Sequence, residues 1–274
     1  MGTVHVDGVD LDYEERGAGP ALLLIHGTAA RVWGSVPEAL ADSARTIDYD
    51  RRSFGASVHP PVTDLTRHRD DAAALLDALG AGPAVIVGWS IGGVVALDLA
   101  LAHPERVRAL VLIEPPLHAK RHPTLPMLRA ILTAQALGRL GRPGPGATAF
   151  LRWASGRRDG ADDFDRVPPA WRAAMLANAA AIVGELRAGT GEHLKRDRLA
   201  SLGLPVTILT GSESDPVFAA CARRLAESLP GAVVREVPGS GHVMQNDRPE
   251  AIVAAARAAL GSETAASGQL SSRP

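Results

Sequence analysis

The sequence predicts an α/β protein with a doubly wound, mostly parallel sheet and an inserted helical lid. Short apolar segments alternate with segments of helical periodicity, which is typical of a parallel sheet with helices on both faces. This alternation stops between about residues 117 and 200 and then resumes. The 274 residues, of which 46% are hydrophobic, are enough for one large domain with an insert.

Eight short apolar segments predict the strands of this sheet. Asp7-Gly8 separates two alternating segments near the start of the chain, and this arrangement is typical of a β-hairpin. The run from Ala21 to Ile25 is continuously apolar and predicts a strand buried on both faces. In chain order, the predicted strands are residues 4–6, 11–13, 21–25, 44–47, 84–87, 107–113, 205–210 and 233–237.

Segments of helical periodicity fill the intervals between these strands. The predicted helix over 65–79 repeats its leucines at helical spacing and is closed by a glycine. A second helix runs from Ser90 to Ala102, and Pro104 marks its end. Two more helices are predicted after the insert, over 216–229 and 251–260.

The segment 117–200 is expected to form the lid. It contains helix-like stretches around 126–138, 146–155 and 169–188. It carries 14 Lys+Arg against 7 Asp+Glu, so it has an excess of positive charge. A solvated helical surface is the more ordinary reason for such arginines, although an anionic substrate is left open. The predicted domains are therefore a core of 1–116 and 201–260, a lid of 117–200, and a flexible tail of 261–274.

The amino-acid composition limits which classes of binding partner are expected. A net charge of -1 gives no general attraction to nucleic acid or to an anionic membrane. The first residues lack the pattern of a signal peptide, and no segment approaches the roughly 20 apolar residues that span a bilayer. The single cysteine, Cys221, excludes an intrachain disulfide and is expected to be buried. We expect a cytoplasmic protein that acts on a small molecule; the sequence leaves its oligomeric state open.

The segment Gly88-Trp89-Ser90-Ile91-Gly92 lies between a predicted buried strand and a predicted helix. The G-x-S-x-G pattern is common by itself, but a strand before it and a helix after it make it typical of a nucleophilic serine. The plainer alternative is an ordinary N-cap serine. As a nucleophile, Ser90 needs two donors for an oxyanion, and we expect them to be the backbone N–H groups of Ile91 and Thr28.

With these segments identified, the sequence resembles the α/β-hydrolase superfamily over nearly its whole length. His26-Gly27, followed by Trp33, resembles the oxyanion loop of that family. The segment 50–57 resembles its D-x-R-G-x-G-x-S segment but has Ser53 where glycine is usual, so its turn can be shaped differently. Gly239-Ser240-Gly241-His242 resembles the family's histidine loop. His242 would then accept the proton of Ser90 and return it to the leaving group.

The acid that completes a Ser–His–acid triad is ambiguous. Asp215 follows the strand 205–210, near the common position, but lies one residue later than the family pattern. Glu114 follows the strand 107–113, from which some family members take their acid. Asp215 is also placed to cap the next helix, because Pro216 follows it. We favour Glu114 slightly and keep both candidates.

A serine nucleophile with an oxyanion hole suits acyl transfer to water, so the resemblance implies hydrolysis of a small or medium carboxylic ester or lactone. Thioester hydrolysis, C–C bond hydrolysis, lyase chemistry and perhydrolysis on the same triad are alternatives, and so is a ligand receptor of this fold with little turnover. Trp33, Trp89 and Trp153 could shape an apolar pocket, although core packing is the more ordinary role of each. No metal or cofactor is expected.

Overall fold

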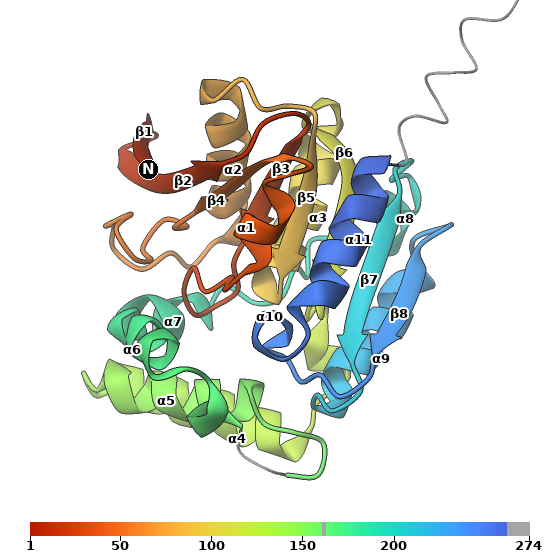
Figure 1. Cartoon of the computed structure of the whole chain (residues 1–274). Helices are drawn as coiled ribbons and strands as arrows, with labels where there is room; N and C mark the ends of the chain where they lie inside the picture. Colours follow the sequence, from red (N-terminus) through yellow and green to blue (C-terminus); the bar gives the residue numbers. More distant parts are fainter. Residues whose placement is uncertain (161–162, 262–274) are drawn as a thin grey trace, which may run out of the picture.

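The computed structural model describes residues 1–160 and 163–261, and these residues form an eight-stranded sheet (Figure 1). The strand order is β1-β2-β4-β3-β5-β6-β7-β8. Only the β1–β2 and β2–β4 pairs are antiparallel among the described strands, which confirms the prediction of a mostly parallel sheet. The strands are β1 (Gly2–Val6), β2 (Val9–Arg16), β3 (Ala21–Ile25), β4 (Arg45–Tyr49), β5 (Ala84–Trp89), β6 (Val107–Ile113), β7 (Val206–Gly211) and β8 (Val233–Val237).

Helices cover both faces of this sheet (Figure 1). Successive residues of a strand point to opposite faces, so Val85 and Val87 of β5 join one apolar cluster and Ile86 joins another. The first cluster contains residues of α1 and α11, and the second contains residues of α2 and α3. The helices outside the insertion are α1 (Val36–Leu40), α2 (Leu65–Ala78), α3 (Ile91–Ala102), η1 (Pro104–Arg106), α8 (Arg196–Ala200), α9 (Pro216–Ala226), α10 (Met244–Asp247) and α11 (Pro249–Gly261).

In the segment between β6 and β7, residues 117–195 are called the insertion below. The helices of the insertion contact one another and gather at one end of the sheet (Figure 1). The lid predicted over 117–200 also includes α8, which lies away from the other helices of that segment (Figure 1). Cys221 is buried, as expected. The tail predicted over 261–274 lies outside the described residues, apart from Gly261 at the end of α11. The helices of the insertion are η2 (Ala119–Arg121), α4 (Leu125–Arg139), α5 (Pro143–Ala154), η3 (Phe164–Arg166), α6 (Pro169–Ala177) and α7 (Ala179–Glu185).

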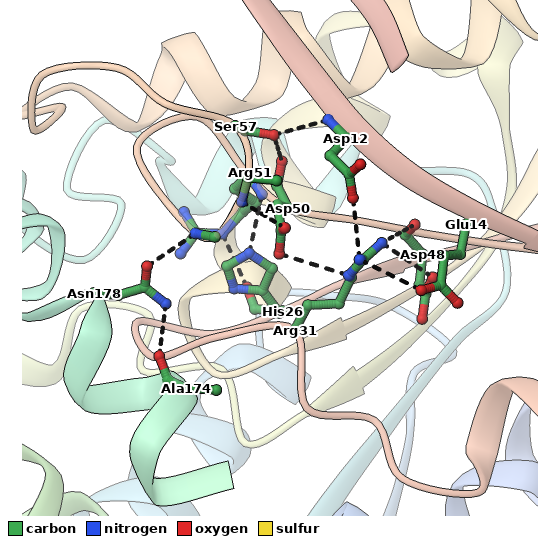
Figure 2. A network of polar contacts seen from close by, with 12 residues as sticks. Asp12, Glu14, His26, Arg31, Asp48, Asp50, Arg51, Ser57, Ala174 and Asn178 are labelled. Carbon is green, nitrogen blue, oxygen red and sulfur yellow. Dashed lines mark hydrogen bonds and ion pairs between the residues drawn. The ribbon is translucent and has the colours of Figure 1, made fainter. Parts of the chain in front are cut away.

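The single helix predicted over 169–188 is instead two helices that meet at Asn178. The side chain of Asn178, which is labelled in Figure 2, connects the insertion to two loops of the core. Its Nδ2 donates to the carbonyl of Ala29 at 3.1 Å, and its Oδ1 accepts from the N–H of Gly55 at 2.9 Å. Apolar periodicity could not reveal this break, because the bonds formed there are with residues more than 100 positions earlier.

The turn at Ser53 keeps a conformation that glycine adopts most easily. Ser53 has φ +77°, in the left-handed region that is costly for other residues. Two hydrogen bonds hold it there: its N–H donates to the carbonyl of Ser57 at 2.9 Å, and its hydroxyl donates to the carbonyl of Pro60 at 2.8 Å. Serine therefore occupies this turn without removing its left-handed backbone.

Arg31 lies among four carboxylates, two from β2, one from β4 and one from the residue after β4 (Figure 2). Its guanidinium is 3.1 Å from Asp12 and 3.6 Å from each of Glu14, Asp48 and Asp50. Asp48 is the least satisfied of these groups, since its buried Oδ1 accepts no hydrogen bond from the described residues. Burial raises the pKa of Asp48 to about 6, against the opposing charges of Arg31 and Arg16. The ionised form of Asp48 therefore lowers the stability of the folded state.

Asp48→Asn is expected to stabilise the protein at neutral pH. The folded pKa of Asp48 lies above the unfolded value of 3.8, so this group favours folding below pH 4 and loses that contribution as pH rises through 6. Asparagine has no such titration. The stability gained by the variant should therefore grow by about 1–3 kcal/mol between pH 4 and pH 7.

Urea unfolding of both proteins across this pH range measures that difference. Asp12→Asn is the matched control, because Asp12 accepts a hydrogen bond from Arg31 at 3.1 Å and should not be stabilised by the change. A difference between Asp48→Asn and the parent that stays constant with pH would contradict the expectation.

Within residues 1–160 and 163–261, no helix combines the length and the apolar character needed to cross a bilayer.

Candidate active site

Ser90 occupies a sharp turn between β5 and α3. Its φ of +53° and ψ of -125° are unfavourable for a residue with a side chain. The N–H of Ser90 donates to the carbonyl of Ile113 at the end of β6, at 2.8 Å, and its own carbonyl accepts from Gly93 at 2.8 Å. The backbone on both sides therefore holds the strained residue in place.

Two glycines allow this turn to form. A Cβ on Gly88 would lie 2.5 Å from the carbonyl oxygen of Gly92, and a Cβ on Gly92 would lie 2.1 Å from the carbonyl oxygen of Ile25. Both distances are impossible for real atoms, and backbone atoms cannot rotate away. The spacing of glycines in the sequence pattern is thus a requirement of close approach between β5, α3 and the end of β3.

His242 and Glu114 contact each other although they lie 128 residues apart in the sequence. His242 Nδ1 is 2.7 Å from Glu114 Oε2, and Glu114 Oε1 accepts the N–H of Gly211 at 2.7 Å. Glu114 is completely buried, and His242 is 4% exposed. A carboxylate can only accept, so Nδ1 carries the proton of a neutral imidazole and Nε2 is left as the acceptor.

Aromatic rings and a backbone contact hold the imidazole from other sides. Phe218 of α9 stacks on the His242 ring with a centroid distance of 4.0 Å and an interplanar angle of 14°. Trp89 donates its indole N–H to the carbonyl of His242 at 2.8 Å. The ring is therefore fixed by Glu114 along its edge and by Phe218 across its face.

Asp215 makes its contacts away from His242. It is the N-cap of α9, and its Oδ1 accepts the N–H of Val217 at 3.0 Å. Its Oδ2 accepts the indole N–H of Trp153 at 3.0 Å and the hydroxyl of Thr124 at 3.3 Å. The structure thus brings Glu114 to His242, while Asp215 joins α9 to the insertion.

A cavity of about 440 Å³ opens beside Ser90 and His242. Thr28 and Ile91 line it as well. Ile91 is the first residue of α3, so its N–H has no acceptor within the helix. Gly27 brings the loop after β3 against the serine, since a Cβ there would lie 2.9 Å from Ser90 Cβ. The two backbone donors expected from the sequence therefore border the same cavity as the serine.

The insertion supplies most of the remaining residues that line this cavity. Most of its apolar contribution comes from α4 and α5, Ala119 and Leu186 add to it, and α9 adds one aromatic ring from the core. The apolar residues from α4, α5 and α9 are Met127, Ile131, Phe150, Trp153, Ala154 and Phe218. Within the described part of the chain, no group of three or more His, Cys, Asp or Glu side chains is arranged to hold a metal ion.

The three tryptophans predicted to shape a pocket have different positions. Trp153 lines the large cavity, and Trp89 lines a smaller space that also borders Ser90 and His242. Trp33 lines neither and is 2% exposed, packed in the core with a ring-centroid distance of 6.5 Å to Trp89. In this structure Trp33 packs against Trp89 in the core.

A buried ion pair lies beside the site, and the sequence analysis did not predict it. Arg51, which is fully buried, contacts Glu185 at the end of α7 at 2.5 and 3.1 Å. The same guanidinium donates to the carbonyls of His26 and Gly27 at 3.0 and 2.9 Å (Figure 2 shows Arg51 against His26). Arg51 lies in the segment that resembles D-x-R-G, but no sequence signal indicated Glu185, 134 residues away.

The charges around this pair are compensated. Burial would raise the pKa of Glu185, but the charge of Arg51 and the contacts with His68 and Arg51 hold it well below its usual range. Burial, followed by the charge of Arg51, lowers the pKa of His26 well below its ordinary value. Neutral His26 accepts the N–H of Arg51 at Nε2, at 3.0 Å, and its Nδ1 lies 2.8 Å from the carbonyl of Gly27.

Comparisons with known proteins agree with this architecture. A protein from Azorhizobium caulinodans, whose name suggests carbamate hydrolysis, is 29% identical over 271 residues, covering 91% of this chain and 94% of that protein. A thermophilic esterase from Thermogutta terrifontis is 26% identical with a TM-score of 0.75, covering 93% of this chain and 95% of that one.

A second solved structure is Est816, described as an N-acyl homoserine lactone degrading enzyme. It is 25% identical with a TM-score of 0.73, and the match covers 94% of this chain and 99% of that one. The sequence profile of the alpha/beta hydrolase family matches residues 22–256. The chain therefore belongs to the alpha/beta hydrolase family.

Proposed function

We propose that this chain is a serine hydrolase that cleaves a small or medium carboxylic ester or lactone, with the insertion as its lid. The observation that carries the proposal is the 2.7 Å contact between Glu114 and His242 beside a strained Ser90, at one cavity. The similarity to an esterase and to a lactone-degrading enzyme supports the same reaction class.

In the first half of the reaction, Ser90 Oγ attacks the substrate carbonyl carbon and His242 Nε2 takes the hydroxyl proton. The N–H groups of Thr28 and Ile91 stabilise the resulting oxyanion. Collapse of the tetrahedral intermediate breaks the bond to the alkoxide, which receives the proton from His242. The products of this half are an acyl-enzyme on Ser90 and a free alcohol, which stays attached to the acyl chain when the substrate is a lactone.

In the second half, His242 removes a proton from water, which attacks the acyl carbon. Ser90 leaves with that proton, and the acid is released. Glu114 acts throughout by holding the imidazole with Nε2 toward the cavity and by stabilising the imidazolium. The fully buried position of Glu114 strengthens this interaction, because little water competes with it.

The test is labelling with a fluorophosphonate probe followed by intact-mass measurement. The parent protein is expected to gain one adduct and Ser90→Ala none, with loss of at least about 10³-fold in kcat on any ester that the parent turns over. Ser155→Ala is the control: Ser155 borders the smaller space beside Ser90, but its hydroxyl donates to the carbonyl of Leu151. It should keep the adduct.

Esters, lactones, thioesters and carbamates would then be compared by kcat/KM. Highest values on esters or lactones support the proposal. An unlabelled parent protein that also fails to turn over any of these substrates would reject it.

A further inference from the structure

The cavity changes in character along helix α4. Met127, Ile131, Gln135 and Arg139 all line it, and their spacing of four residues places them on one face of the helix. Met127 belongs to the same apolar cluster as Phe218, which stacks on His242. From Met127 the helix extends about 18 Å to Arg139, at 1.5 Å per residue. The wall is thus apolar beside the reacting groups and cationic at its far end.

Arg187 joins Arg139 at the lining of the cavity. Helix α4 is connected to the turn after α7, which carries Arg187, because Gln135 Nε2 donates to the carbonyl of Leu186 at 3.2 Å. Gln135 is one turn before Arg139, and Leu186 directly precedes Arg187. The contact therefore fixes the two arginine-bearing segments beside each other.

Other charges of the cavity wall already have partners. Glu185 is paired with Arg51, and Lys120 lies 2.9 Å from Glu192. Arg139 and Arg187 are exposed, and within residues 1–160 and 163–261 neither has a carboxylate within ion-pair distance. Two guanidiniums at the edge of an apolar cavity are suited to an oxyacid, because each can give paired N–H donors to a carboxylate.

We propose that Arg139 and Arg187 form a binding site for a free carboxylate of the substrate. This inference rests on the proposed function and specifies its substrate class: esters whose acyl chain ends in a second, free carboxylate. The apolar stretch of α4 contacts the methylene chain, the scissile carbonyl lies at Ser90, and the terminal carboxylate reaches the two arginines. A solvated helical surface would account for the arginines alone, but not for their shared place on the cavity wall.

The experiment compares monomethyl suberate with the methyl alkanoate of equal chain length. The parent protein should have a kcat/KM at least about tenfold higher for the acid monoester, mainly through KM, as expected for a charge-assisted contact made before and during reaction. This ratio should fall as salt is added, since the arginines are exposed. Arg139→Gln and Arg187→Gln should each reduce the ratio about threefold to tenfold, and the double variant should remove it.

Arg129→Gln is the matched control. Arg129 is an exposed arginine on the same helix that does not line the cavity, so its loss should leave the ratio unchanged. A ratio near one in the parent, or an equal fall in the Arg129 variant, would overturn the proposal.

Binding of suberate to Ser90→Ala, measured by calorimetry, separates this inference from the proposed function. If suberate binds Ser90→Ala, this binding disappears when the arginines are also replaced, and the parent protein turns over no ester, the carboxylate site is supported and the hydrolase is rejected. Turnover of neutral esters without suberate binding would do the reverse.

Discussion

Glu114→Gln is expected to reduce kcat by about 10³–10⁴-fold, the scale seen when the acid of a serine triad becomes an amide. Glu114 accepts two hydrogen bonds, from His242 Nδ1 and from the N–H of Gly211. Glutamine has one carbonyl oxygen, so its NH₂ group must face one of these donors. If it faces His242, the imidazole loses the tautomer that leaves Nε2 free to accept the Ser90 proton.

Asp215→Asn should act on stability instead. Asparagine still caps α9, and only one of the contacts with Trp153 and Thr124 needs to weaken. We expect a loss of about 1 kcal/mol and a kcat within tenfold of the parent.

Steady-state kinetics and urea unfolding of both variants measure the two effects. Both changes replace one carboxylate by an amide of equal size, so each variant controls for the other. An inactive Asp215→Asn beside an active Glu114→Gln would assign the acid to the other residue.

The fold could be predicted because buried strands leave continuous apolar segments in the sequence. Strands β3, β5 and β6 are apolar on both faces, and this leaves runs such as Ala21 to Ile25 with no polar residue. Short helices lack such a signal. The five residues of α1 show little more than one turn, so no periodicity develops.

The site was predictable where it is local in sequence. Ser90, Ile91 and the flanking glycines form one turn, and the G-x-S-x-G pattern is enough to predict the geometry of that turn. The acid is not local: Glu114 and Asp215 follow neighbouring strands at the same edge of the sheet, so sequence position could not separate them. Only the three-dimensional contact with His242 does so. The same limit applies to Arg139 and Arg187, which line one cavity only because the insertion folds back on itself.

Arg51→Met is expected to destabilise the protein by about 3–5 kcal/mol, the usual result of removing one partner of a buried ion pair. The change leaves Glu185 buried without its cation, and it removes donors from the carbonyls of His26 and Gly27. Without Arg51, only His68 still opposes the effect of burial on Glu185, so the pKa of Glu185 rises. The stability deficit should therefore be larger at pH 8 than at pH 5.

The double variant Arg51→Met/Glu185→Leu separates the two consequences. Replacing both charges by apolar groups removes the unpaired carboxylate, so the double variant should be more stable than Arg51→Met by about 2–3 kcal/mol. It does not restore the bonds to His26 and Gly27. If those bonds position the loop before Thr28, the double variant should refold stably and still show a lower kcat on a neutral ester. Full recovery of kcat would mean that Arg51 serves the stability of the insertion alone; a persistent loss would mean that the insertion and the oxyanion loop are positioned by one arginine.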